Sequence, residues 1–208
     1  MRTMMSRPLM LSCIAVLLLA VACSTADEIS DVAEEAVDTA EDVARQAAEA
    51  MGVSDELKQA LREEEGAIDR VYRDSGGLPT VGIGHLVTPR DGLRVGDRID
   101  HDKMEAMLAE DLTLAEQAVR DLVRGLPLSQ NEYDALVDLV FNVGPGRLSE
   151  RDSPGLQDAI RRRDYKAIGD NLIYTRDASG RRVKGLVMRS ERRRRMFMEN
   201  RYDDPRKE

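Results

Sequence analysis

The segment Glu65–His85 constrains the fold more than any other part of the chain, because it combines turn-forming glycines with acidic and hydroxyl side chains. Gly66 follows a run of helix-forming residues, and glycine readily takes the left-handed conformation that ends a helix. Two short extended pieces, residues 71–73 and 80–83, flank Ser75-Gly76-Gly77, which is typical of a hairpin turn. The segment therefore predicts a helix end followed by a β-hairpin.

Most of the remaining chain predicts helices, so the expected fold class is α+β and mostly helical. Ser54 is the N-cap expected for the helix that ends at Glu65. Ser129 and Glu132 form a capping-box sequence ahead of an apolar helix that stops at Gly144, and we expect this to be the central buried helix. Further elements are expected as helices at residues 102–123 (capped by Asp100), 154–163, 165–174 and 184–200, and as a third strand at 93–99.

The composition restricts how the core is built and excludes several kinds of site. Aromatic residues make up 3% of the chain, which has no Trp, so the core must consist mainly of aliphatic side chains and Met. The two cysteines, Cys13 and Cys23, are both close to the N-terminus, so the rest of the chain can form no internal disulfide. With only His85 and His101 beyond that point, no structural zinc site is expected, and no metal or organic cofactor is implied.

Residues 1–23 have the pattern of an export signal. Arg2 and Arg7 precede an apolar run at 9–22 that is shorter than the roughly 17 to 25 residues needed to span a bilayer. Cys23 follows Leu-Ala-Val-Ala, which resembles the bacterial lipoprotein signal, where the cysteine is lipidated. An ordinary cleaved signal and a weak signal-anchor are the alternatives. All three predict an exported protein on the periplasmic side of a bacterial membrane, anchored to it in two of the three cases.

Charge runs divide the rest of the chain. Residues 24–53 are rich in Ala and acids with a thin apolar stripe, which predicts a solvated spacer helix. Residues 54–202 are expected to form the folded domain, and 203–208 a tail. Two charge runs are predicted to be solvated, namely Glu63-Glu64 and the four arginines at 192–195. The arginines are expected to lie near an anionic polymer. The export signal and the net charge of -8 argue against nucleic acid as a partner.

The hairpin region carries the side chains that glycoside cleavage requires. One carboxylic acid must protonate the leaving oxygen, and a second carboxylate must act from the other side of the sugar ring. Glu65 at the helix end and Asp74 after the first strand are placed to face each other across a cleft. Thr80 shares a strand face with Gly82 and Gly84, whose missing side chains leave a bare surface on which a sugar could lie.

The spacing of Glu65, Asp74 and Thr80, followed by Val-Gly-Ile-Gly-His85, resembles the phage-type lysozymes, or endolysins, of glycoside hydrolase family 24. Further positions carry the resemblance over roughly residues 55–200: Asp111, residues 141–144, Gly185, Leu186 and Arg189. It implies a lysozyme-like fold in which a hairpin lobe and a helical lobe flank a cleft.

The resemblance also implies a division of labour. Glu65 would be the general acid, Asp74 would act with the attacking water on the opposite face, and Thr80 would help to hold that water, with inversion at the sugar carbon. Such a mechanism requires Glu65 to keep its proton near neutral pH through partial desolvation, and Asp74 to stay ionised. It also requires a carboxyl separation of about 6.5 to 9.5 Å, which admits a water.

Other matching positions imply supporting roles. His85 would be structural and pair with Asp111, and Asn142 matches a position that lines the cleft floor, where it would bind sugar or cap the helix end. The last helix departs from the family pattern of paired arginines and a glutamate, because Ser190 and Arg193 occupy two of those places.

These observations predict an exported, monomeric lysozyme that cuts the β-1,4 bond between N-acetylmuramic acid and N-acetylglucosamine in peptidoglycan and so causes bacteriolysis. Two alternatives remain: a catalytically silent peptidoglycan-binding lipoprotein, and a lytic transglycosylase, which needs only the acid.

Overall fold

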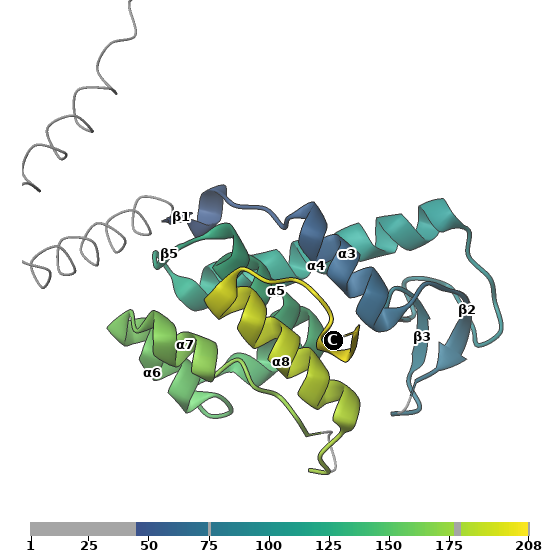
Figure 1. Cartoon of the computed structure of the whole chain (residues 1–208). Coiled ribbons are helices and arrows are strands. Elements are labelled where there is room, and N and C mark those ends of the chain that lie inside the picture. The colour runs from purple at the N-terminus through teal and green to yellow at the C-terminus, as the bar shows by residue number, and fades with distance from the viewer. Residues whose placement is uncertain (1–44, 75, 177–179, 208) are drawn as a thin grey trace, which may run out of the picture. The chain divides into compact units, whose positions relative to one another are not determined.

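Helices make up most of the described chain and small sheets complete it, as the α+β prediction expected (Figure 1). The computed structural model describes residues 45–74, 76–176 and 180–207. The α-helices are α3 (Asp55–Glu65), α4 (His101–Val123), α5 (Gln130–Val143), α6 (Pro154–Arg162), α7 (Tyr165–Asp170) and α8 (Lys184–Glu199). The strands are β1 (Gln46–Ala47), β2 (Ile68–Arg73), β3 (Pro79–Gly82), β4 (His85–Leu86) and β5 (Pro127–Leu128), and short 3-10 helices are η2 (Ala48–Ala50), η3 (Pro145–Leu148) and η4 (Pro205–Lys207).

The expected capping residues start the main helices. The Ser54 hydroxyl accepts the backbone N–H of Leu57 at 3.0 Å and so caps α3. At the start of α4, the Asp100 carboxylate accepts the N–H of Lys103 at 2.8 Å. These side chains satisfy amides that have no partner within their own helix, which is why both helices begin where the sequence predicts. The capping box predicted at the start of α5 is also present.

Helix α5 is the central helix of the helical lobe. Nine consecutive residues, from Glu132 to Val140, are buried, because α5 packs against α4 on one side and α8 on another. Its apolar side chains join those of α4, α6, α7 and α8 in one large core. Gly144 ends the helix with a φ of 76°, as the sequence predicts.

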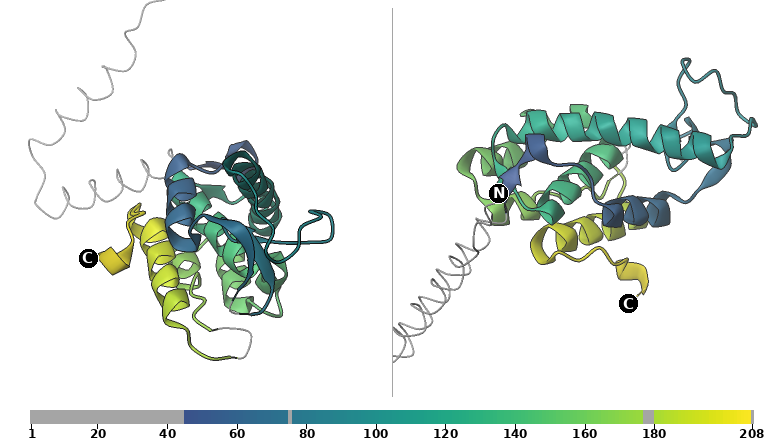
Figure 2. Two further views of the ribbon diagram at one scale, coloured as in Figure 1. Left: turned by 90° about the vertical axis from the view of Figure 1, so that its right-hand side faces the viewer. Right: turned by 90° about the horizontal axis from the view of Figure 1, so that it is seen from above.

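The hairpin lobe is a three-stranded antiparallel sheet in the order β2-β3-β4. Val71 and Val81 form a small second core with Met107 from the first half of α4. The rest of α4 extends into the large core, so this helix connects the two lobes (Figure 2).

Two predicted elements differ from the structure. Residues 93–99 contain turns and one isolated bridge between Arg70 and Arg98, so the third strand of the sheet is β4 instead. Gly96 has a φ of 100°, a conformation that interrupts a strand. Helix α7 ends at Asp170, four residues before the predicted end, and residues 172–175 have no regular structure.

The last part of the predicted spacer, residues 45–53, belongs to the folded domain. Strand β1 pairs with β5, and the side chains of Ala48 and Met51 are buried in the large core. Arg120 on α4 donates to the carbonyl of Met51 at 2.9 Å. A solvated helix was expected there because the stripe of alanines is weakly apolar; tertiary packing overrides that pattern. The remaining spacer residues 24–44 and the signal at 1–23 lie outside the described residues, within which no helix is long and apolar enough to cross a membrane.

The predicted solvated charges are largely paired or buried. Arg192 and Arg193 are buried in α8, and Arg192 donates to the Glu63 carboxylate at 3.0 Å. Glu64 pairs with Arg206 at 2.8 Å. The expected tail therefore also packs on the domain, because η4 brings Arg206 over the end of α3.

Candidate active site

Glu65 is the last residue of α3, at the junction with the hairpin lobe. Gly66 follows it with a φ of 74°, which ends the helix. A side chain built at Gly84, whose φ is 75°, would place its Cβ 3.1 Å from the Glu65 carboxyl carbon. Gly84 therefore accommodates Glu65 itself, a packing role that the prediction of a sugar-binding surface did not include.

A buried arginine from the helical lobe reaches the same carboxylate. Arg189 on α8 forms an ion pair with Glu65 and a second with Asp138 on α5, the latter at 2.8 Å. The Arg189 side chain is 6% exposed, whereas that of Glu65 is 25% exposed. Burial alone would lower the pKa of Arg189, but the charges of Asp138 and Glu65 raise it above its ordinary value. Glu65 thus touches both lobes and still reaches solvent.

Asp74 organises the turn between β2 and β3. Its carboxylate oxygen Oδ1 accepts the backbone N–H groups of Gly76 and Leu78, each at 2.8 Å. The Asp74 N–H also donates to the Leu78 carbonyl at 2.9 Å. The side chain is therefore held in one orientation by the hairpin, as a side chain used for chemistry must be.

Tyr72 links the predicted catalytic residues. It pairs directly with Thr80 across the β2–β3 ladder, so these two side chains lie on one face of the hairpin, and Asp74 follows Tyr72 by two residues just after β2. Burial raises the pKa of the Tyr72 phenol, and the charges of Glu65 and Asp74 raise it further. Both carboxylates thus act on one side chain. The sequence analysis missed Tyr72, although its position in the strand pattern was available.

Thr80, Gly82 and Asn142 differ in their surroundings. Thr80 is buried, and its hydroxyl donates to the Leu78 carbonyl at 3.2 Å. Gly82 is also buried, and a Cβ there would lie 3.1 Å from Met104, so it faces the core and does not fit the predicted bare sugar surface. The Asn142 amide oxygen accepts from Arg193 at 3.2 Å.

His85 makes the predicted contact. Its Nδ1 lies 2.8 Å from a carboxylate oxygen of Asp111 on α4, and its Nε2 lies 3.5 Å from Asp91. Burial raises the pKa of Asp111, an effect that His85 partly offsets. The contact joins β4 to α4, so it ties the hairpin lobe to the helix that spans both lobes.

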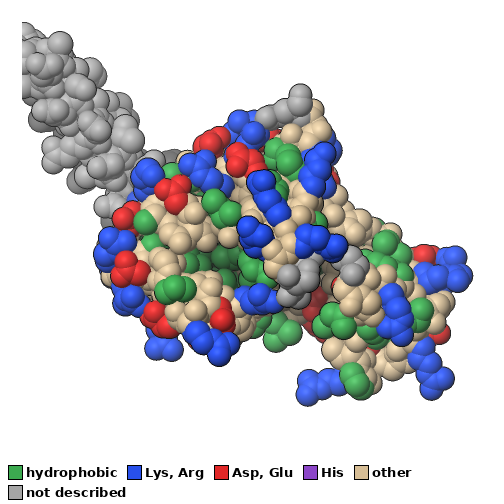
Figure 3. All heavy atoms as spheres, turned by 90° about the horizontal axis from the view of Figure 1, so that it is seen from below, with side chains coloured by type: hydrophobic (Ala, Val, Ile, Leu, Met, Phe, Trp, Pro, Cys, Tyr) green, Lys and Arg blue, Asp and Glu red, His purple; other side chains and the backbone are tan. Residues whose placement is uncertain are grey.

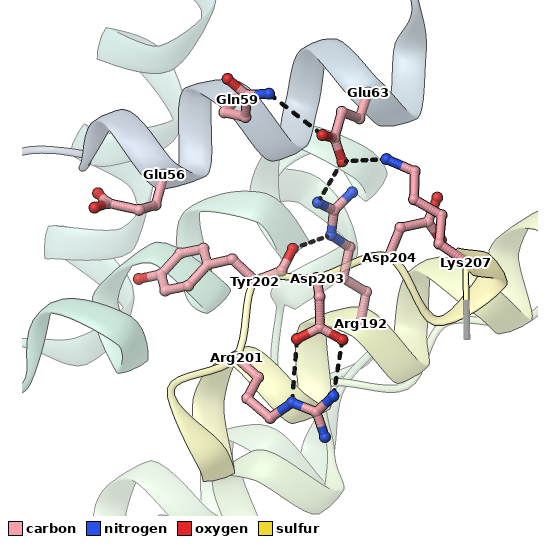
Figure 4. Close-up of a pocket in the computed structure, with 9 residues that line it drawn as sticks. All are labelled: Glu56, Gln59, Glu63, Arg192, Arg201, Tyr202, Asp203, Asp204 and Lys207. Carbon is pink, nitrogen blue, oxygen red and sulfur yellow. Dashed lines mark hydrogen bonds and ion pairs between the residues drawn. The ribbon is translucent and has the colours of Figure 1, made fainter.

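The molecular surface is hollowed between the hairpin lobe and the helical lobe. Figure 3 shows this hollow with Lys and Arg side chains around it. A separate pocket of about 550 Å³ lies between α3, α8 and the C-terminal segment (Figure 4). Its lining residues are Glu56, Gln59, Glu63, Arg192, Arg201, Tyr202, Asp203, Asp204 and Lys207, a set that contains none of the predicted catalytic residues. In the described part of the chain, no three His, Cys, Asp or Glu side chains are grouped to hold a metal ion.

Comparison with known proteins decides the family. The profile described as phage lysozyme matches residues 62–193, more than half of the chain. The chain belongs to the phage lysozyme family. The endolysin of Salmonella phage P22 is 36% identical over 149 residues, which cover 71% of this chain and 99% of the phage protein. The SAR-endolysin of Escherichia phage Mu is 31% identical over 140 residues, covering 67% and 77% respectively.

The fold agrees with solved members of the phage lysozyme family. The endolysin from Escherichia coli O157:H7 phage FAHEc1 superposes with a TM-score of 0.61 at 25% identity, and the match covers 74% of this chain and 98% of that chain. The expected lysozyme-like fold is therefore confirmed. As a phage lysozyme, the protein is a glycosidase that degrades peptidoglycan.

Proposed function

We propose that the protein hydrolyses the β-1,4 bond between N-acetylmuramic acid and N-acetylglucosamine with inversion. Glu65 donates its proton to the glycosidic oxygen as the bond to the sugar carbon breaks. Asp74 stabilises the positive charge that develops and takes a proton from the water that attacks the opposite face, while Thr80 helps to hold this water. Asn142 is proposed to contact sugar at the cleft floor. The product has gained one water, and no cofactor takes part.

The observation that carries this proposal is the environment shared by Glu65, Tyr72 and Asp74. Glu65 is held between Arg189 and the backbone at Gly84, so its position is restricted. The hairpin fixes Asp74 through two backbone amides, and the charges of Glu65 and Asp74 both act on Tyr72. Two oriented carboxylates around one space are what glycoside cleavage needs. The role of His85 is then to hold the lobes together through Asp111.

The test compares wild-type protein with the Glu65→Gln variant on a suspension of purified cell walls. We expect the wild type to clear the suspension and to release fragments whose mass includes one added water. Removing a general acid slows catalysis by about 10² to 10⁴-fold, so Glu65→Gln should lose clearing to that degree while the protein stays folded. The matched control is Glu63→Gln in the same helix turn, which should clear normally.

Each competing reaction gives a different result in this experiment. Fragments that lack the added water would identify a lytic transglycosylase, and a wild type that binds walls without cutting them would identify a silent binding protein. Clearing by Glu65→Gln at the wild-type rate would show that Glu65 is not the acid.

We further propose that the protein is exported, acts as a monomer on the periplasmic side of a bacterial membrane, and is anchored there through a lipid on Cys23. The apolar run before Cys23 supports export, and one relative is itself a SAR-endolysin. Mass spectrometry of the mature N-terminus distinguishes a lipidated cysteine from a cleaved signal and from a retained signal-anchor.

A further inference from the structure

Asp138 fixes the arginine that contacts Glu65. Its Oδ1 accepts two hydrogen bonds from Arg189, from Nε at 3.2 Å and from a terminal nitrogen at 2.8 Å. The other terminal nitrogen of Arg189 contacts Glu65. A guanidinium is planar and rigid, so a carboxylate that holds one edge determines where the remaining nitrogen points. The orientation of Arg189 toward Glu65 therefore depends on Asp138.

Asp138 also neutralises a second buried cation. Its Oδ2 accepts from Nε of Arg193 at 2.7 Å, and the Arg193 side chain is fully buried. The terminal nitrogens of Arg193 donate to the Leu172 carbonyl at 3.1 Å and to Asn142 at 3.2 Å. Arg193 is one of the positions at which the last helix departs from the family pattern. Asp138 supplies the charge that allows an arginine to be buried there.

We propose that Asp138 is a positioning residue for catalysis: it directs Arg189 onto Glu65 and offsets the buried positive charge of Arg189 and Arg193 behind the catalytic acid. This inference rests on the proposed role of Glu65 as the acid. Without Asp138, the charge of Arg189 beside Glu65 would lose its buried counter-charge, and so would that of Arg193 behind it. Nearby positive charge stabilises a carboxylate in its ionised, catalytically inactive form.

The charge of Asp138 is permanent at the pH values at which the enzyme works. Burial would raise the pKa of Asp138, but Arg189 and Arg193 outweigh that effect and the pKa lies below its ordinary range. Two other titratable groups interact electrostatically with the Glu65–Arg189–Asp138 cluster: Glu64 on α3 with Arg189 and Asp138, and Tyr72 on β2 with Glu65. Neither group makes a hydrogen bond to Asp138 among the described residues, and Asp138 is the carboxylate that contacts both Arg189 and Arg193 there.

The experiment measures wall clearing against pH for the purified full-length protein and two variants. In Asp138→Asn, we expect the maximal rate to fall about tenfold and the alkaline limb of the profile to move about one unit to lower pH. The double variant Asp138→Asn/Arg193→Met removes one negative and one positive charge. The alkaline limb of its profile should return to the wild-type pH. Its maximal rate should stay about tenfold below that of the wild type, because Arg189 still lacks the Asp138 carboxylate that orients it.

The matched control is Asp134→Asn, one turn earlier in α5. Asp134 is also buried, but it binds Ser54 and Tyr202 and makes no contact with Arg189 among the described hydrogen bonds. Its profile should match the wild type even where its melting temperature falls.

Two results would overturn the proposal: an Asp138→Asn profile that coincides with that of Asp134→Asn, or a double variant with the wild-type maximal rate. If Asp138→Asn does not fold, the double variant alone decides, because its charge balance is kept. A wild type that cuts no walls would instead refute the proposed function and is recognised before any variant is compared.

Discussion

At the scale of single residues, Glu65 lies against a position where a side chain would crowd its carboxyl group. Gly84 has a positive φ, and a Cβ built there would lie 3.1 Å from the Glu65 carboxyl carbon. Gly77, in the turn of the same lobe, has a similar φ of 80°, but no atom lies within 4 Å of a Cβ built there. The two glycines share one backbone conformation and differ in what a side chain there would touch. Substituting each in turn therefore separates the cost of backbone strain from the effect of crowding Glu65.

We therefore expect Gly84→Ala and Gly77→Ala to cost similar stability, about 1–2 kcal/mol each, because an L-residue resists the left-handed conformation. Only Gly84→Ala should also lower wall clearing, by about tenfold or more, because it pushes the Glu65 carboxylate out of place. Thermal melting and clearing rates of both variants check this expectation. Equal rates for the two would mean that Glu65 tolerates displacement.

At the scale of elements, β1 and η2 extend the folded domain to the N-terminal side of α3. Gln46 and Ala47 pair with Leu128 and Pro127, and Arg45 pairs with Glu132 at 2.9 Å. These contacts join residues that are far apart in the sequence. The sequence of the N-terminal segment itself is that of an ordinary acidic, alanine-rich segment. The segment takes its structure because it packs against α4 and α5.

A chain that begins at Gly52 should accordingly be less stable than one that begins at Arg45. It lacks the buried side chains of Ala48 and Met51, and loss of such burial costs about 3 kcal/mol. We expect a melting temperature lower by roughly 10 °C for a domain of this size. Identical melting of the two chains would restore the predicted domain boundary after residue 53.

At the scale of the whole described molecule, the C-terminal segment joins α3 to α8. The Tyr202 hydroxyl and the Ser54 hydroxyl both donate to Asp134, at 2.7 and 2.5 Å. Farther along, Arg206 pairs with Glu64 and with Asp204 (Figure 4 shows the adjoining pocket). The segment thus braces the helix that carries Glu65 from the side away from the hairpin.

The brace should weaken in acid. Hydrogen bonds from Arg206 lower the pKa of Asp204 from 3.8 to about 2. A carboxylate with a lowered folded-state pKa stabilises the fold above its unfolded pKa, and this contribution is lost as the pH falls through the folded value. Asp204→Asn should therefore melt below the wild type at pH 6, with the gap closing between about pH 4 and 2. A gap that persists at pH 2 would mean that ionisation of Asp204 is not the cause. Asp203→Asn, which removes an exposed pair with Arg201, should show a smaller gap throughout.

The sequence by itself determined the local features of this protein. Ser54 and Asp100 start their helices, and Gly66 and Gly144 end theirs. The hairpin forms between α3 and α4. These features are predictable because caps, turns and periodicity depend on residues within a few positions of each other. The same local spacing was enough to predict the family. The His85–Asp111 contact was predicted only through that resemblance.

The tertiary structure alone decided the partners of the buried charges. An arginine run has the same local pattern whether it faces water or carboxylates, so Arg192 and Arg193 were predicted to be solvated. Asp138 was overlooked within an apolar helix, although a charged residue between Val137 and Leu139 was the available signal. Only the packing of α8 on α5 and α3 brings these charges together, and the free energy of a buried charge depends on that partner rather than on its sequence neighbours.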